Sequence, residues 1–158
     1  MKNRVVYPLC IISFVVLLDQ ITKYLARTLI HPMESIELLP VLNLVSVRNQ
    51  GAAFGMFSSL GNNFFIIISL AAILFMLWVI ITAKEDYRVF SLLAAGAIGN
   101  LIDRVTLGYV VDFIDVTVSG HHWPAFNVAD SALSLGIVFL ILNLVINLNV
   151  VKDAGRER

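Results

Sequence analysis

The sequence predicts an all-α membrane protein of four transmembrane helices, with a small interfacial β-cradle in its first extracytoplasmic segment. The chain has 158 residues, of which 59% are hydrophobic and only 14% are charged, and its mean hydropathy is +0.88. A soluble domain carries about a quarter charged residues and could not bury this much apolar surface in so small a core. We therefore expect one integral membrane domain over residues 1–158.

Composition also excludes several classes of function. The net charge is zero, so no basic excess indicates a nucleic-acid partner. Cys10 is the only cysteine, which excludes an internal disulfide and a cysteine-based zinc site. His121 and His122 are adjacent in a predicted loop without a ligand partner at helical spacing, so we expect no metal and no cofactor.

The first helix is predicted near residues 5–27. Lys2 and Arg4 followed by an apolar run imitate a signal peptide, but the run leads into polar residues rather than a small-residue cleavage site. Asp19 and Lys23 lie four residues apart and share one helical face, with the acid before the base. We expect this ion pair to be structural support, and it could also brace a site at the same depth.

A β segment is predicted near residues 35–58. Pro32 breaks the preceding helix, and residues 41–48 are β-branched and partly alternating, which is typical of a strand. The segment should lie at the interface or pack on protein, because a strand edge in hydrocarbon leaves backbone groups unpaired. It could be a plain connecting hairpin or a platform that receives an extended peptide by strand addition. The spacing favours neither.

Three further helices are predicted near residues 64–83, 89–104 and 128–151. The first is an uncharged run of the length that a membrane span needs, and the last precedes a charged tail. The helix near 89–104 is long enough only if it includes Asp103 and Arg104, which then lie near the far interface.

The basic residues predict the topology. Seven of the eleven basic residues flank helix ends on one side of the predicted bundle: Lys2, Arg4, Lys84, Arg88, Lys152, Arg156 and Arg158. The positive-inside rule makes that side cytoplasmic, so both termini are expected inside and the loops at 28–63 and 105–126 outside.

Polar residues gather between Gly99 and Asp130, where two apolar segments are joined. This stretch holds four aspartates, two asparagines and one arginine: Asp103, Asp112, Asp115, Asp130, Asn100, Asn127 and Arg104. Asn100, Asp103 and Arg104 share one helical face. Ionisable groups beside hydrocarbon face each other or water and mark a functional site by default.

Asp112 and Asp130 are the candidate reactive pair. They lie 18 residues apart on a stretch that can fold back, so they could meet. Two close carboxylates share a proton, and such a pair can activate water with one member and protonate a leaving amine with the other. Structural alternatives remain open. Asn127 is a good helix N-cap with Asp130 at N3, and Asp112 and Asp115 could be solvated loop acids.

The sequence resembles bacterial lipoprotein signal peptidase, also called signal peptidase II, over nearly its whole length. Five blocks carry the resemblance: Asp19-Gln20-x-x-Lys23, Arg48-Asn49-x-Gly51-Ala52-Ala53-Phe54-Gly55, Gly99-Asn100-x-x-Asp103-Arg104, Val110-Val111-Asp112-Phe113 and Phe126-Asn127-x-Ala129-Asp130. Any one block alone is weak, whereas five in this order and spacing are specific.

The resemblance implies an aspartyl protease of the bacterial plasma membrane, with its active site at the outer face. It implies Asp112 and Asp130 as the catalytic pair and Asn49, Asn100, Arg104 and Asn127 as the lining of the substrate site. We also expect Gly51 at the substrate site, and Asp19, Lys23 and Asp103 as polar support. The implied substrate is a prolipoprotein whose cysteine already carries diacylglycerol, cut just before that cysteine. The expected partners are this substrate and membrane lipid, and we expect a monomer.

Two other classes are alternatives. A small proton-coupled transporter would spread its acids through the bilayer depth, whereas these acids cluster on one side. A non-enzymatic membrane assembly protein would keep its function with alanine at Asp112 or Asp130.

Overall fold

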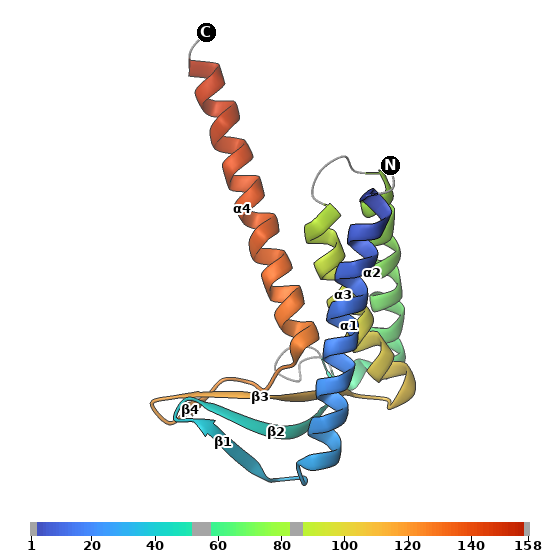
Figure 1. Ribbon diagram of the computed structural model, residues 1–158, viewed down its shortest axis with the longest axis vertical. Helices are drawn as coiled ribbons and strands as arrows, with labels where there is room; N and C mark the ends of the chain where they lie inside the picture. The colour runs from blue at the N-terminus through green and yellow to red at the C-terminus, as the bar shows by residue number, and fades with distance from the viewer. Residues whose placement is uncertain (1–2, 52–57, 83–86, 157–158) are drawn as a thin grey trace.

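Four helices in the computed structural model are long and apolar enough to cross a membrane (Figure 1). The structure describes residues 3–51, 58–82 and 87–156. The helices are α1 (Asn3–Leu29), α2 (Asn62–Thr82), α3 (Tyr87–Thr106) and α4 (Val128–Arg156). All four predicted helices are confirmed. α1, α3 and α4 extend beyond the predicted bounds, and α2 begins two residues before its predicted start. The predicted loop that begins at Lys84 falls largely outside the described residues.

A four-stranded antiparallel sheet lies at one end of the bundle, and both chain termini lie at the other end (Figure 1). Its strands, in spatial order, are β1 (Ser35–Leu39), β2 (Leu42–Asn49), β3 (Val110–Val118) and β4 (His121–His122). A short 3-10 helix, η2 (Ser58–Leu60), precedes α2. The predicted β segment is confirmed for its two strands, and the part of it at 52–57 lies outside the described residues.

β3 is the main difference from the sequence prediction, which treated residues 105–126 as a loop. It pairs with β2 in a register that places Asp112 opposite Val47 and Asp115 opposite Asn43. Both aspartates are buried, at 2% and 6% exposure, so the alternative of solvated loop acids is wrong. The acids interrupt an otherwise β-branched run, which hides the strand from a pattern of alternation.

β2 pairs with β1 as a hairpin and also pairs with a third strand, β3. Its pairing with β1 runs to Val45, and its pairing with β3 runs to Asn49. The hairpin alternative therefore describes residues 35–45. Addition of an extended peptide to the β segment near 35–58 stays a prediction.

α3 is the central helix of the bundle. Half of its most apolar stretch is buried, against 11–17% in the other three helices, whose large side chains face outward. Two glycines allow this close packing: a Cβ at Gly99 would lie 2.6 Å from Asp19 Oδ2, and one at Gly96 would lie 2.4 Å from the Ala129 carbonyl oxygen. α4 diverges from the other helices toward its C-terminal end (Figure 1).

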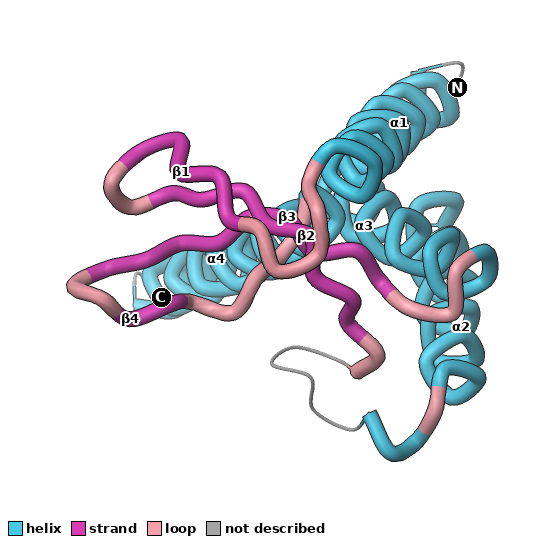
Figure 2. Tube along the Cα trace, turned by 90° about the horizontal axis from the view of Figure 1, so that it is seen from below, coloured by secondary structure: helices cyan, strands magenta, loops and turns pink. Residues whose placement is uncertain are grey.

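The sheet is joined to the bundle at the end of α1. Phe113 of β3 packs against Ala26 and Ile30 of α1 in a small buried cluster. Seen from below, the strands spread to one side beyond the helices (Figure 2). The segment after β4 runs back alongside β3, with Phe126 bridging to Ile114, and leads into α4. This arrangement brings the start of α4, the end of α3 and the start of β3 together.

Candidate active site

Asp130 lies in the first turn of α4, where it forms the predicted helix cap. The Asp130 backbone N–H donates to Asn127 Oδ1 at 2.8 Å, and the Asn127 backbone N–H donates to Asp130 Oδ2 at 3.3 Å. This reciprocal pair is a capping box, and the helix dipole favours the negative charge there. The structural alternative for Asp130 is therefore correct. The cap uses Asp130 Oδ2, whereas Oδ1 accepts from Asn100, so the cap does not prevent a chemical role for Asp130.

Amide side chains connect Asp130 to Asp112. Asn100 of α3 donates through Nδ2 to Asp130 Oδ1 at 2.8 Å. Asn127 donates through Nδ2 to Asp112 Oδ1 at 2.7 Å and to Asn100 Oδ1 at 3.3 Å. Asn49 of β2 donates to Asp112 Oδ2 at 3.0 Å. Donors from β2, α3 and the residue before α4 thus hold two acids that are distant in sequence.

Asp112 lies outside the membrane-spanning helices, and its environment favours the protonated form. Burial, and after it the charge of Asp130, raises the pKa of the Asp112 carboxyl from 3.8 to about 6. Hydrogen bonds from Asn49 and Asn127 and the charge of Lys23 oppose this rise. A carboxyl group with such a pKa can exchange a proton near neutral pH, as general acid–base chemistry requires.

A buried charge network lies behind the two acids. Lys23 Nζ is 2.9 Å from Asp19 Oδ2 and 3.1 Å from Asp103 Oδ2, and it donates to Asn100 Oδ1 at 2.9 Å. Asp19 and Lys23 are 0% and 2% exposed. The predicted ion pair is confirmed, and Asp103 completes it as a triad.

The two acids of the triad also hold the backbone near the site. Asp19 Oδ1 accepts the Ala129 N–H of the first turn of α4 at 2.8 Å. Asp103 Oδ2 accepts the Val111 N–H at the start of β3 at 3.0 Å. Gln20, which the sequence analysis quoted without a role, donates to Asp103 Oδ1 at 3.0 Å and to the Gly99 carbonyl at 3.1 Å. The network therefore fixes the positions of Asp112 and Asp130 in space.

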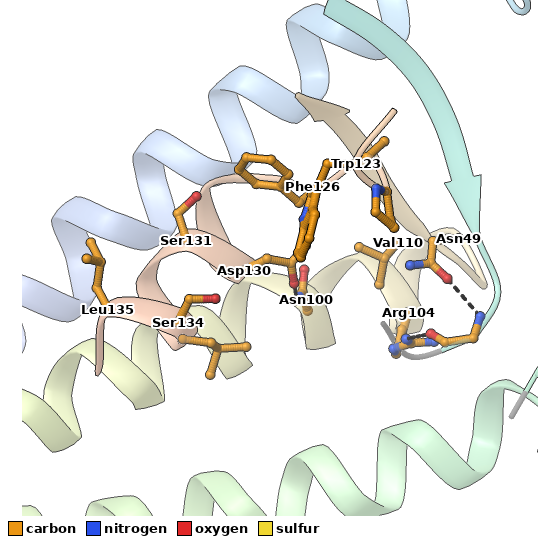
Figure 3. A pocket seen from close by; sticks show the side chains of 14 residues that line it. Asn49, Asn100, Arg104, Val110, Trp123, Phe126, Asp130, Ser131, Ser134 and Leu135 are labelled. Atoms are coloured by element: carbon orange, nitrogen blue, oxygen red, sulfur yellow. Dashed lines mark hydrogen bonds between the residues drawn. The ribbon is translucent and has the colours of Figure 1, made fainter. Parts of the chain in front are cut away.

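A mostly apolar cavity of about 780 Å³ opens beside Asp130 (Figure 3). Its lining residues come from β2, α3, the start of β3, the segment before α4 and α4 itself: Asn49, Gly51, Asn100, Arg104, Val110, Trp123, Pro124, Ala125, Phe126, Asp130, Ser131, Leu133, Ser134 and Leu135. Cavities of this size, with few polar groups on an apolar wall, are typical ligand sites.

Arg104 lies at one end of this cavity. Its Nη2 donates to the Gly51 carbonyl oxygen at 2.6 Å, and its guanidinium lies 4.4 Å from the centroid of the Phe65 ring. Its Nη1 is buried without a hydrogen-bond partner among the described residues. A buried donor without a partner is costly, and a ligand oxygen in the cavity would satisfy it.

The predicted site residues fall into two groups. Five line the cavity: Asn49, Gly51, Asn100, Arg104 and Asp130. Asp112 and Asn127 lie behind the lining, at 2% and 0% exposure, so Asn127 reaches the site through its contact with Asp112.

Sequence reasoning missed the segment Trp123–Phe126 and the α4 serines Ser131 and Ser134 as lining residues. An exposed tryptophan beside a membrane interface was the available signal for the first of these.

Asp115 and His122 form a separate polar contact on the sheet. His122 Nδ1 lies 2.9 Å from Asp115 Oδ2, and Asn43 Nδ2 donates to the same oxygen at 3.0 Å. Across the described ranges, no three or more His, Cys, Asp or Glu side chains are grouped so that they could hold a metal ion.

The chain is similar to known proteins over most of its length. Residues 11–146 match the family described as signal peptidase (SPase) II. A lipoprotein signal peptidase of Thermodesulfovibrio yellowstonii is 52% identical over 130 residues, covering 82% of this chain and 88% of the relative. One from Staphylococcus aureus is 42% identical over 146 residues, covering 89% of this chain and 88% of the relative.

A solved structure of a bacterial membrane enzyme has the same fold. It superposes with a TM-score of 0.85 at 39% identity, covering 91% of this chain and 90% of the solved one. The transporter and assembly alternatives find no support in these relatives. The chain is a multi-pass membrane peptidase that belongs to the signal peptidase II family.

Proposed function

We propose that this protein removes the signal peptide from prolipoproteins as an aspartic endopeptidase whose reacting groups are Asp112 and Asp130. The observation that carries the proposal is the pair itself: two carboxyl groups tied together by Asn100 and Asn127 at the wall of an apolar cavity. The names of the relatives supply the substrate class, because they are lipoprotein signal peptidases. Residues 1–158 act as a single domain in this proposal.

The reaction uses one shared proton. The ionised member of the pair takes a proton from a water molecule, whose oxygen attacks the scissile carbonyl carbon, while the protonated member donates to the carbonyl oxygen. The tetrahedral intermediate then collapses, the C–N bond breaks, and the leaving amine takes a proton from the pair. A hydroxyl of the intermediate returns its proton to the pair as the new carboxyl group forms, which restores the starting state. Asn49, Asn100 and Asn127 hold both carboxyl groups in place through these steps.

Arg104 binds the substrate near the cut. Its buried Nη1 is aimed at a carbonyl oxygen of the peptide, while Nη2 keeps its bond to Gly51. Asn49, Gly51 and Asn100 line the same end of the cavity. A charged donor of this kind contributes about 1.5–3 kcal/mol when it is paired.

The substrate carries a diacylglyceryl group on the cysteine that follows the cut. The cavity is walled by Trp123, Phe126, Leu133 and Leu135, which offer apolar contact beside Asp130. Each buried methylene of a lipid chain is worth about 0.8 kcal/mol, and most of that energy already holds the substrate in the membrane. The lipid then fixes the depth of the cysteine in the membrane, so that the preceding peptide bond lies at Asp112 and Asp130. We propose a monomer.

The experiment compares a diacylglyceryl-modified precursor with the same precursor unmodified, each incubated with the purified protein in one detergent. We expect release of the signal peptide with a cut just before the modified cysteine, and release at least about 100-fold slower from the unmodified precursor. Equal rates would refute positioning by lipid and leave a more general membrane peptidase. No release from either precursor would refute the function.

The active site is proposed to face the outside of the plasma membrane, with both termini in the cytoplasm. The sheet, whose strands β2 and β3 carry residues that line the cavity, lies at the end of the bundle opposite the termini (Figure 1). Arg88 in the first turn of α3 and Lys152 and Arg156 in the last turns of α4 lie at the terminal end, which supports a cytoplasmic location of that end. After Cys10 is replaced by alanine, a cysteine at Ser119 should react with an impermeant thiol reagent outside intact cells, and one at Asp86 should not. The opposite labelling would invert this topology.

A further inference from the structure

Lys23 is a buried cation that does not line the cavity. It is 2% exposed, and an ammonium group has three N–H donors. Two of them go to the acids Asp19 and Asp103, and the third goes to Asn100 Oδ1 at 2.9 Å. The third bond is not needed to neutralise Lys23, because two carboxylates already surround it. It connects the cation to the candidate active site.

This third bond fixes which way the Asn100 amide faces. An ammonium group only donates, so the Asn100 atom that faces Lys23 must be the oxygen. The Asn100 NH₂ group then faces Asp130 and donates to Oδ1 at 2.8 Å. A rotated amide would place donor against donor at Lys23 and acceptor against acceptor at Asp130. Asn127 Nδ2 supports the same orientation by donating to Asn100 Oδ1 at 3.3 Å.

We propose that Lys23 is a positioning residue for the peptidase reaction: it orients the Asn100 amide so that a donor always faces Asp130 Oδ1. Asp130 Oδ1 is thereby kept as an acceptor whose donor has a fixed position. This inference rests on the proposed function, since it concerns the same two aspartates. Lys23 was expected to be structural support, and the proposal adds that it acts on Asp130 through the Asn100 amide.

The charge of Lys23 has a second effect on the pair. Charged side chains near the pair come from three of the packed elements besides α4: Asp19 and Lys23 from α1, Asp103 and Arg104 from α3, and Asp112 from β3. The residues of α2 include no titratable side chain. Lys23 lowers the pKa of Asp112, against the larger effects of burial and of Asp130. The cation thus favours the singly ionised pair over the doubly protonated one.

The test removes Lys23 together with one of the two carboxylates that it neutralises, so that one buried carboxylate rather than two is left without its cation. Lys23→Gln combined with Asp103→Asn is compared with Asp103→Asn alone, which keeps the cation beside Asp19 and Asn100. For each protein, kcat and KM for signal-peptide release from the lipid-modified precursor are measured between about pH 4.5 and 8. Relative to its control, the double variant should lose at least about tenfold in kcat near pH 6, with KM within about threefold. Its acid limb should move up by about one pH unit.

Two additions keep this test decisive. Lys23→Arg in the Asp103→Asn background keeps a cation and should return the acid limb toward that of the control. If the first double variant does not fold, Lys23→Gln with Asp19→Asn is compared with Asp19→Asn alone, for which the same shift is expected. A merely structural role for Lys23 would change stability and leave the pH profile in place.

The results separate the two proposals. Acid limbs that coincide between the Lys23→Gln double variant and its control overturn the role of Lys23, whatever the turnover, and leave the proposed function standing. Cleavage that survives both Asp112→Asn and Asp130→Asn overturns the proposed function, and the role of Lys23 with it.

Discussion

Two polar regions lie within one turn of each other along α3, and they differ in whether their groups are satisfied. Behind the site, Lys23 has a partner for every donor, and its acids Asp19 and Asp103 also hold backbone N–H groups. At the cavity, Arg104 has a buried nitrogen without a partner among the described residues, and the acidic pair faces open space through Asp130.

The difference separates residues that hold the fold together from residues that act on the substrate. A satisfied buried network holds elements in place, and removing one member leaves a charge uncompensated. A buried group that lacks a partner costs free energy in the empty protein, and a ligand recovers that cost on binding. We therefore expect substitutions behind the site to lower stability and substitutions at the cavity to lower substrate binding or turnover.

Asp19→Ala should produce the largest loss of stability. It leaves Lys23 underpaired and removes the acceptor of the Ala129 N–H, so the free energy of unfolding should fall by about 3–5 kcal/mol. The thermal midpoint in detergent measures this, and Glu37→Ala on the exposed strand β1 is the control. An unchanged midpoint together with lost cleavage would contradict a structural role for Asp19 and indicate a direct role in the reaction.

Asp112 should make the stability depend on pH in a stated direction. Its pKa rises from 3.8 to about 6 on folding, so the folded state binds more protons, and stability falls as pH rises through this range. The full effect corresponds to about 3 kcal/mol between about pH 4 and 7.

Asp112→Asn cannot titrate and should lack this dependence. The midpoint of Asp112→Asn minus that of the parent protein should therefore increase as pH rises from about 4 to 7. A difference that stays constant with pH would show that the environment of Asp112 does not raise its pKa.

Arg104→Lys should weaken substrate binding and leave the bundle folded. The variant keeps a positive charge but lacks the second guanidinium nitrogen, so kcat/KM should fall by about 10- to 100-fold. Arg48→Lys is a matched control, because Arg48 also lies over an aromatic ring, that of Tyr109, but does not line the cavity. Equal losses for both variants would contradict a substrate bond at Arg104.

The sequence predicted features that depend on nearby residues. Four apolar runs of spanning length, the i, i+4 pair of Asp19 and Lys23 and the cap at Asn127 and Asp130 all appear in the structure. Each depends on helical geometry alone, in which residues three or four apart share a face.

Features that depend on distant contacts were not predictable from spacing. The contact between Arg104 and Phe65 joins two helices, and β3 is recognisable as a strand only through its pairing with β2. The burial of Asn127 follows from the approach of β3 to the start of α4, for which the sequence has no local signal. The resemblance to a family named these residues together as one site, but it did not show which of them face the cavity.

The central claim is that Asp112 and Asp130 carry the reaction, and the most direct test measures signal-peptide release by Asp112→Asn and Asp130→Asn. Asn keeps the size of the side chain but cannot exchange a proton, so each variant should lose about 10⁴-fold in turnover while remaining folded. Asp115→Asn is the matched control, because Asp115 is also buried on β3 but contacts Asn43 and His122 rather than the amides that hold the pair, and it should keep turnover within about threefold of the parent protein. Near-normal turnover in either Asp112→Asn or Asp130→Asn would contradict the claim.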